Sequence, residues 1–381
     1  MAKRPTVYDV AERAGVSIAT VSFTFRQPER VKQSTRDSVL VAAGALGYVP
    51  SASARGLAKG RTGALGLFSF DYLRSEQADG TPILGASRSG HRGGVEVVRG
   101  GDEDDLRIFP LYMDEVQRGV ELECWRRGYA LMIGGGNHAS SGAVVNDIAG
   151  WVDGLAVFPH TVPDDVLDRV ARRIPVVALS APARQDNLSH VTVGNTAGMR
   201  ALTEHLIADH ALTDLLFVGR MLFSENEARF RGFRSALRAA GLRVPRKPLA
   251  HDSERTGREM VSDLLARGPL PQALVCVTDE LAVELMDGLA KNGVEVPKQV
   301  VVTGFDGIAA GRLVRPALTT IRQPMELMGR TAVDILVDRL AQRELHPVSR
   351  QLPVKLVLRE SCGCPRGRES APQPLHLGIN G

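Results

Sequence analysis

The sequence has few cysteines and no long hydrophobic run. Four Cys among 381 residues are too few for a disulfide framework in a chain of this length. No apolar run approaches the roughly 18 residues needed to cross a bilayer. The opening residues, Met-Ala-Lys-Arg-Pro, lead into a capped helix pattern instead of an apolar signal region. These absences predict a cytoplasmic protein.

The common catalytic motifs are also missing. Gly134-Gly135-Gly136 follows an apolar run that reads as a strand, but the spacing of a dinucleotide fingerprint is absent. His205 and His210 lack the spacing of a zinc protease, and neither a nucleophile elbow nor a P-loop occurs. We therefore expect no enzymatic activity and no cofactor.

The composition is that of a globular protein with two or three domains, with 44% hydrophobic and 24% charged residues. The charge is uneven. Residues 1–61 contain ten Lys and Arg against four Asp and Glu, whereas the rest of the chain has 37 against 39. A basic excess confined to one segment is what the neutralisation of DNA phosphates requires.

The basic segment has the pattern of a helix-turn-helix. Thr6 can cap a helix that carries Val7, Val10 and Ala11 on one face. Gly15 permits the tight turn that follows, and Ser17 can cap a second helix. In such a unit the start of the second helix meets base edges in the major groove. The residues expected there are Ser17, Ile18, Ala19, Ser22 and Phe23.

Two further helices are predicted downstream. Residues 35–46 form an amphipathic pattern that can cover the first two helices with Val39, Ala42, Ala43 and Leu46. Pro50 suits the first turn of a short fourth helix over residues 51–58.

This segment resembles the lac-repressor (LacI/GalR) family of bacterial transcription regulators. The resemblance rests on these strings: Tyr8-Asp9-Val10-Ala11, Ala14-Gly15-Val16-Ser17, Thr20-Val21-Ser22, Thr35-Arg36, Gly47-Tyr48-Val49-Pro50 and Ala54-Arg55-Gly56-Leu57. It implies that residues 1–49 are a DNA-binding headpiece and residues 50–62 a hinge helix and linker. The DNA-contacting set so implied is Thr6, Tyr8, Ser17, Ile18, Ala19, Thr20, Ser22, Phe23, Arg26, Tyr48, Ser51, Ala54, Arg55 and Leu57. Leu57 would be a wedge in the minor groove, and the alternative is a hydrophobic cap on a linker.

The chain departs from the family pattern where bases are read. Phe23 stands where the family commonly has Arg, and Ser51 replaces the usual Asn. Arg is a bidentate partner for guanine, whereas Phe23 can contact a thymine methyl or pack inward, the usual place for an aromatic residue at helical spacing. The operator sequence of relatives therefore does not transfer.

The rest of the chain alternates short apolar runs with longer amphipathic ones. The predicted strands are 64–68, 129–133, 155–158, 176–179, 215–218, 274–277 and 300–303. The predicted helices are 114–127, 164–172, 195–207, 225–240, 254–266 and 280–292. This repetition indicates an α/β fold of doubly wound parallel sheets, and about 300 residues of it indicate two lobes. Ligands of such sheets bind beyond the carboxyl ends of the strands.

The resemblance covers this body too, through Arg127-Gly128-Tyr129, Val152-Asp153-Gly154-Leu155, Thr303-Gly304-Phe305-Asp306 and residues 318–324. It implies a two-lobed, periplasmic-binding-protein-like body over residues 63–360, with three chain crossings between the lobes. It also implies effector contacts at Arg229 and Asp279, and His160 is a further candidate. The alternatives are a surface cation for Arg229, a helix-capping carboxylate for Asp279 and a solvated loop residue for His160.

Two segments fall outside this pattern. Residues 71–107 are rich in Gly and charge, which predicts a flexible insertion, with a lid or partner surface as the alternative. Residues 361–381 are predicted to be a disordered tail. For Cys362 and Cys364 a metal site would need two more ligands, and only His376 is near in sequence, which favours an inert or redox-labile tail and no metal.

Together these features predict a homodimeric transcription regulator, a repressor that binds a palindromic operator. A small ligand between the lobes, a sugar or related metabolite, would modulate its affinity for DNA. The tail lacks the leucine heptads of a tetramer. The alternative is a free sugar-binding transport protein, which would need an export signal in place of the basic headpiece.

Overall fold

The computed structural model describes residues 5–49, 61–70, 91–92, 95–96, 111–136, 141–182, 187–249, 257–342 and 346–365. The chain divides into two compact units. The first comprises residues 1–64 with 151–153, and the second comprises 65–150 with 154–381. Every helix among the described residues is too short or too polar to cross a membrane.

The headpiece, residues 5–49, contains three α-helices and one 3-10 turn. They are α1 (Val7–Ala14), α2 (Ile18–Arg26), η1 (Pro28–Arg30) and α3 (Gln33–Leu46). Thr6 caps α1 in a capping box with Asp9, and Ser17 caps α2 by accepting from the Thr20 N–H at 3.1 Å. Gly15 ends α1 with a φ of 65°. The predicted caps and turn of the helix-turn-helix are therefore confirmed.

One small apolar core joins the three helices of the headpiece. Val10, Val21 and Val39 are fully buried, one from each helix, and Ala11, Ala42 and Ala43 fill the space between them. These small side chains let the three short helices approach closely, and the partly buried Phe25, Leu46 and Tyr48 pack around them.

The first unit ends at the start of the body. The backbone N–H groups of Thr62 and Gly63 donate to the two carboxylate oxygens of Asp153, at 2.6 and 2.8 Å. Asp153 is itself 8% exposed. The end of the linker is thus held by a buried carboxylate instead of by water.

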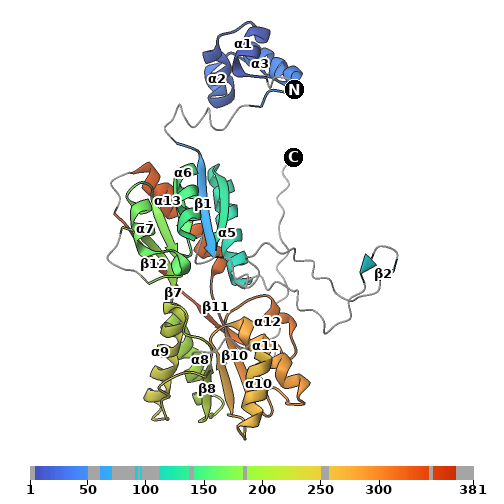
Figure 1. Cartoon of the computed structure of the whole chain (residues 1–381), viewed down its shortest axis with the longest axis vertical. Helices are drawn as coiled ribbons and strands as arrows, with labels where there is room; N and C mark the ends of the chain where they lie inside the picture. The colour runs from blue at the N-terminus through green and yellow to red at the C-terminus, as the bar shows by residue number, and fades with distance from the viewer. Residues whose placement is uncertain are drawn as a thin grey trace. The chain divides into compact units, whose positions relative to one another are not determined.

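The described part of the body contains two large sheets, each the centre of one lobe (Figure 1). The N-lobe sheet has the order β12-β7-β6-β5-β1-β4, and the C-lobe sheet has the order β13-β11-β10-β9-β8. The N-lobe strands are β1 (Ala64–Phe70), β4 (Ala130–Gly136), β5 (Gly154–Val157), β6 (Val176–Leu179), β7 (Ser189–Val193) and β12 (Ser349–Leu352). The C-lobe strands are β8 (Leu215–Val218), β9 (Ala273–Cys276), β10 (Val301–Asp306), β11 (Thr319–Arg322) and β13 (Lys355–Val357).

The chain passes between the lobes three times, as the resemblance implied. It leaves the N-lobe after β7, returns after β11, and crosses again between β12 and β13. The N-lobe helices are α5 (Leu111–Arg127), α6 (Ser141–Trp151), α7 (Asp164–Ala171) and α13 (Met325–Ala341). The C-lobe helices are α8 (Asn195–Ala208), α9 (Ser224–Ala239), α10 (Gly257–Ala266), α11 (Asp279–Lys291) and α12 (Ala310–Leu313). Short 3-10 turns are η3 (Pro159–Thr161) and η4 (Glu360–Cys362).

The C-lobe sheet is apolar on both faces. Ala273, Val275 and Val277 pack toward α8 and α9, whereas Leu274 and Cys276 pack toward α10 and α11. Successive strand residues point to opposite faces, so a strand covered on both sides reads as one continuous apolar run. This is why β9 could be predicted from the sequence.

In the N-lobe, α5 and α13 lie against each other at a glycine contact. A Cβ on Gly329 would lie 2.1 Å from the Val116 carbonyl oxygen, and one on Gly119 would lie 2.0 Å from the Glu326 carbonyl oxygen. The two helix backbones therefore touch where both lack a side chain. Below this contact α5 and α13 cover β1, β5, β6 and β7 with a buried apolar cluster.

The sequence prediction missed several elements and misplaced one segment. Strands β7, β11, β12 and β13 and helices α6 and α13 were not predicted. Residues 361–365, predicted as the start of a disordered tail, are instead packed on the C-lobe, with Ser361 and Cys362 buried. The insertion lies outside the described residues except for a short antiparallel pair, β2 (His91–Arg92) and β3 (Val95–Glu96).

Candidate nucleic-acid interface and ligand site

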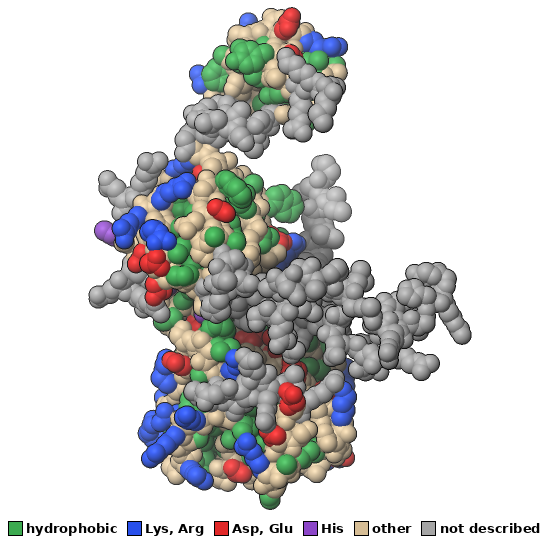
Figure 2. All heavy atoms as spheres, in the orientation of Figure 1, with side chains coloured by type: hydrophobic (Ala, Val, Ile, Leu, Met, Phe, Trp, Pro, Cys, Tyr) green, Lys and Arg blue, Asp and Glu red, His purple; other side chains and the backbone are tan. Residues whose placement is uncertain are grey.

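The N-terminal half of α2 presents the predicted base-reading residues to solvent. Ser17, Ile18 and Ala19 are exposed, and Ile18 has 41% of its surface accessible. Thr20 and Ser22 are half-buried, and the Thr20 hydroxyl lies 2.9 Å from that of Ser17. An exposed, largely uncharged start of a recognition helix suits contacts with base edges. Figure 2 shows apolar and basic side chains together on the surface of the headpiece.

Phe23 does not pack inward. Its side chain is 38% exposed, and the Arg30 guanidinium carbon lies 4.8 Å from the ring centre. The aromatic residue that packs into the headpiece core is Phe25, whose ring centre lies 6.1 Å from that of Tyr48. A half-exposed ring beside a guanidinium leaves Phe23 free to meet an apolar group such as a thymine methyl.

The other predicted DNA contacts occupy different environments. Tyr8 is 67% exposed on α1, Thr6 is half-buried in the capping box, and Tyr48 is half-buried against the core. Arg26 ends α2, and its side chain is not described. The hinge residues Ser51, Ala54, Arg55 and Leu57 lie outside the described residues.

In the body, Arg229 is buried on α9 with a partner for each part of its guanidinium. Its Nε donates to Asn195 Oδ1 at 2.9 Å and its Nη1 to the Val277 carbonyl at 2.7 Å. Its Nη2 lies 3.1 Å from Asp306 Oδ1, and its Cζ lies 3.9 Å from the centre of the Phe305 ring. Arg229 is 5% exposed, so it is not a surface cation.

Asp306 is the residue that the sequence reasoning missed. It ends β10 with a φ of 125°, which turns the chain at the carboxyl end of the strand, and it is 4% exposed. Gln323 Nε2 donates to Asp306 Oδ1 at 2.7 Å, alongside the Arg229 guanidinium. Burial raises the pKa of Asp306, and the Arg229 charge opposes this shift. Asp306 could have been found from the sequence, because it ends the stretch Thr303-Gly304-Phe305-Asp306 at the carboxyl end of a predicted strand, where ligands bind.

Asp279 lies at the start of α11, after β9, and is fully buried. Its Oδ2 accepts from the N–H groups of Gly307 and Ile308 at 2.7 and 2.9 Å, and its Oδ1 accepts from the Thr320 hydroxyl. Burial and the neighbouring Asp306 raise the pKa of Asp279 to about 7. The helix itself is capped by Thr278, so Asp279 holds the loop after β10 instead of capping α11.

Two polar groups of the N-lobe lie at the start of α5 and directly after β6. The Tyr112 and Ser180 hydroxyls are hydrogen-bonded, and Ser180 follows β6 with a φ of 54°. Burial raises the pKa of Tyr112, and the charges of Asp306, Arg229 and Glu225 on the C-lobe act on it. Tyr112 therefore lies within electrostatic range of the Arg229–Asp306 pair.

Two further contacts join the lobes near these residues. The His160 ring lies 4.2 Å, centre to centre, from the ring of Phe223, and burial lowers the pKa of His160 to about 4. The Leu111 N–H donates to Glu280 Oε1 at 3.1 Å, and burial together with Asp306 raises the pKa of Glu280 to about 7. His160 is therefore a half-buried residue between the lobes and not a solvated bystander.

Two parts of the chain match described families. Residues 6–51 match the bacterial regulatory proteins of the lacI family, and residues 203–362 match the periplasmic binding protein-like domain.

Relatives and solved structures match almost the whole chain. The HTH-type transcriptional repressor PurR of Escherichia fergusonii is 27% identical over 93% of this chain and 96% of its own length. The structure of a transcriptional regulator CelR–cellobiose complex is 26% identical, with a TM-score of 0.63, covering 94% of this chain and all of that one. A lac repressor dimer bound to operator and the anti-inducer ONPF is 22% identical, with a TM-score of 0.74, covering 94% and 99% of the two chains.

Proposed function

Because the chain belongs to the lacI family of bacterial regulatory proteins, we propose that it is a transcriptional repressor whose affinity for an operator is set by a small ligand bound by the body. The observation that carries the proposal is the pairing of two sites in one chain. An exposed recognition helix lies in the headpiece, and a buried guanidinium–carboxylate pair lies at the strand ends of the body.

The headpiece supports DNA binding by its charge and its exposed residues. The basic excess is confined to residues 1–61, and α2 offers Ile18 and Phe23 to solvent although both are apolar. Exposed apolar residues on a recognition helix favour binding where they contact thymine methyl groups in the major groove. A free sugar-binding transport protein does not need a DNA-binding module, so the headpiece favours a regulator over a transport protein.

The body supports binding of a polyhydroxy ligand such as a sugar. Arg229 and Asp306 offer charged donors and acceptors, and Tyr112 and Ser180 of the other lobe offer hydroxyls. Parallel sheets bind ligands beyond their carboxyl strand ends, where Asp306 and Ser180 lie, and Arg229 and Tyr112 contact these two residues from helices α9 and α5. Two similar structures carry sugars, cellobiose in CelR and ribose in a lacI-family regulator from Enterococcus faecium. We propose Arg229, Asp306 and His160 as ligand contacts, and Asp279 as the residue that positions the loop after β10.

Residues from both lobes near one site supply a mechanism for allostery. A ligand that bridges Tyr112 and Arg229 binds one arrangement of the lobes more tightly than another and shifts the population toward it. We propose that the protein acts as a homodimer on a palindrome, because paired headpieces then reach two half-sites about one helical turn apart. We propose no enzymatic activity.

DNA binding is tested by selecting bound duplexes from fragmented genomic DNA with the full chain, followed by gel shifts at several salt concentrations. We expect a palindromic site of roughly 14 to 20 base pairs and a steep loss of affinity with salt. Ile18→Ala should weaken specific binding. The matched control is Val41→Ala, because Val41 is an apolar residue on α3 with 73% of its surface exposed.

Deleting residues 1–61 separates the two sites. The truncated chain should lose sequence-specific DNA binding and keep its ligand response. Sequence-specific binding by the truncated chain would refute the assignment of the headpiece.

Ligand binding is tested by thermal shift of the full chain with a panel of sugars that starts with cellobiose and ribose. A ligand at a hundred times its Kd adds about 2.7 kcal/mol of stability. Arg229→Met should abolish the shift, and Ile18→Ala should keep it. A shift that survives in Arg229→Met would place the ligand elsewhere.

A further inference from the structure

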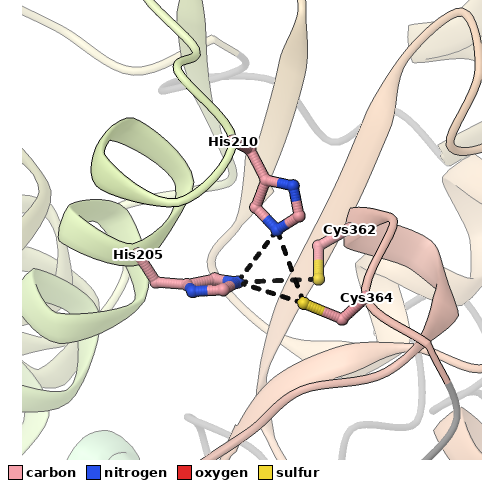
Figure 3. A group of neighbouring side chains, drawn as sticks. All are labelled: His205, His210, Cys362 and Cys364. Carbon is pink, nitrogen blue, oxygen red and sulfur yellow. Dashed lines mark hydrogen bonds between the residues drawn. The ribbon is translucent and has the colours of Figure 1, made fainter.

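We propose that His205, His210, Cys362 and Cys364 form a structural zinc site that fastens the C-terminal segment to α8. The four residues come from distant parts of the chain, yet their ligand atoms all lie within 4.8 Å of one another. Figure 3 shows both rings and both sulfur atoms pointing toward a common centre. This arrangement is separate from the ligand site proposed above.

Four of the six separations between the ligand atoms match those of a tetrahedral zinc site. With bonds of about 2.0–2.1 Å to nitrogen and 2.3 Å to sulfur, tetrahedral geometry places two nitrogens about 3.3 Å apart and a nitrogen about 3.6 Å from a sulfur. The two Nε2 atoms lie 3.1 Å apart. The nitrogen–sulfur separations are 3.8 Å for His205 and Cys362, 3.6 Å for His205 and Cys364, and 3.5 Å for His210 and Cys364.

Neighbouring residues orient these ligands. His205 Nδ1 lies 2.6 Å from Asp209 Oδ2, which leaves Nε2 to face the cluster. A carboxylate behind a histidine ligand is a recurring feature of zinc sites, because it fixes the tautomer and raises the basicity of the ring. The Thr319 hydroxyl lies 3.1 Å from Cys362 Sγ, within reach to donate to a thiolate. Gly363, with a φ of 94°, provides the turn that returns Cys364 to the same point.

The charge balance and the ligand types favour zinc. Two thiolates neutralise one divalent cation, so the filled site carries no net charge, which suits a place where Cys362 and His205 are 1% and 8% exposed. A tetrahedral set of two sulfurs and two nitrogens is typical of zinc, and four protein ligands leave no open position for a substrate. The role is therefore structural and not catalytic.

The site joins α8 to η4, two elements that are far apart in the sequence. His205 lies in the last turn of α8, the helix whose first residue, Asn195, contacts Arg229. Cys362 ends η4, whose Ser361 donates to the Val302 carbonyl at 2.6 Å and accepts from the Thr319 N–H at 2.8 Å. A bound zinc would fix α8 to β10 and β11 at the end far from the proposed ligand contacts.

The first experiment measures zinc in the full chain after exposure to Zn²⁺ under reducing conditions and dialysis. We expect about one zinc per chain, and a loss of this zinc in Cys364→Ser. Cys124→Ala is the matched control, since Cys124 is a free, buried thiol on α5 outside the cluster, and it should retain zinc. Cobalt(II) in place of zinc should give the visible bands of tetrahedral coordination and thiolate-to-metal charge transfer, which needs no variant.

The second experiment distinguishes a metal site from packing alone. Asp209→Asn should weaken zinc binding about 10- to 100-fold in competition with a chromophoric chelator. A chelator should lower the melting temperature of the wild type and leave that of Cys364→Ser unchanged. Absence of zinc and of the cobalt spectrum in the wild type would overturn the proposal. So would a mass and thiol count that reveal a disulfide between Cys362 and Cys364 in the reduced, zinc-treated protein.

Discussion

The buried pair of Arg229 and Asp306 can be tested without knowledge of the ligand. Arg229→Met keeps an unbranched side chain against Phe305 but removes every hydrogen bond of the guanidinium. Asp306, at 4% exposure, then keeps the Gln323 side chain and the Asp279 backbone N–H as donors but has lost its opposing charge. Removing one partner of a buried ion pair costs about 3–5 kcal/mol, because the other charge is left buried and unpaired.

The reverse change should cost less. Asp306→Asn keeps an oxygen for Gln323 and removes only the negative charge, while Arg229 retains Asn195 and the Val277 carbonyl. We expect a loss of about 1–3 kcal/mol. In the double variant neither charge remains, so its loss should be smaller than the sum of the single losses by about 2 kcal/mol.

The measurement is thermal or urea unfolding of the four full-length proteins. For a domain of 150–250 residues, each kcal/mol lowers the melting temperature by about 2–4 °C, so Arg229→Met should melt about 6–20 °C below the wild type. Purely additive losses in the double variant would refute the ion pair. A wild-type melting temperature for Arg229→Met would refute its burial.

Three other predictions follow from particular contacts. The pKa of Asp279 is raised from 3.8 to about 7 in the folded protein. Between these two pH values Asp279 is protonated in the folded protein and ionised in the unfolded chain. The free energy of unfolding should therefore fall as the pH rises from about 4 to about 7. Asp279→Asn can keep all three hydrogen bonds and should reduce that slope in melting experiments across this range, and an unchanged slope would assign it to other groups. Gly329→Ala should lower the free energy of unfolding in urea by at least about 1–3 kcal/mol, because the new Cβ would collide with the Val116 carbonyl oxygen. The control is Gly150→Ala on α6, which has open space around it and should not destabilise the protein. Equal effects of the two changes would contradict the close contact between α5 and α13. Phe23→Arg should shift the preferred base to guanine at one position of each half-site by about 1–3 kcal/mol, measured by selection from random duplexes, and an unchanged preference would remove Phe23 from the set of base-reading residues.

The strands that the sequence predicted well are those covered on both faces. Val176–Leu179 and Leu215–Val218 match β6 and β8, because continuous apolar runs are needed where helices cover both sides of a sheet. The strands that were missed carry polar residues or lie at an edge. β7 begins with Ser189 and His190, both buried, and β12 is largely exposed. Their positions depend on partners that only the folded chain supplies.

The residues of both sites also depend on contacts between distant parts of the sequence. Arg229 could be predicted from the family resemblance, but its pairing with Asp306 joins α9 to the end of β10, 77 residues later in the sequence. The cluster of two histidines and two cysteines could not be predicted because His205 and His210 are more than 150 residues from Cys362 in sequence. The fold of the C-lobe, and not the spacing of the residues, brings His205 and His210 to that point.

The last two strands of the chain each complete a different lobe. β12 forms the edge of the N-lobe sheet beside β7, and β13 forms the edge of the C-lobe sheet beside β11. During synthesis, therefore, neither sheet can be completed until residues 349–357 have left the ribosome. A product truncated before residue 349 would leave the inner strands β7 and β11 as sheet edges in place of β12 and β13, and exposed edges that are not protected favour aggregation. Because β12 and β13 are almost adjacent in sequence, the two lobes become complete within a few residues of each other.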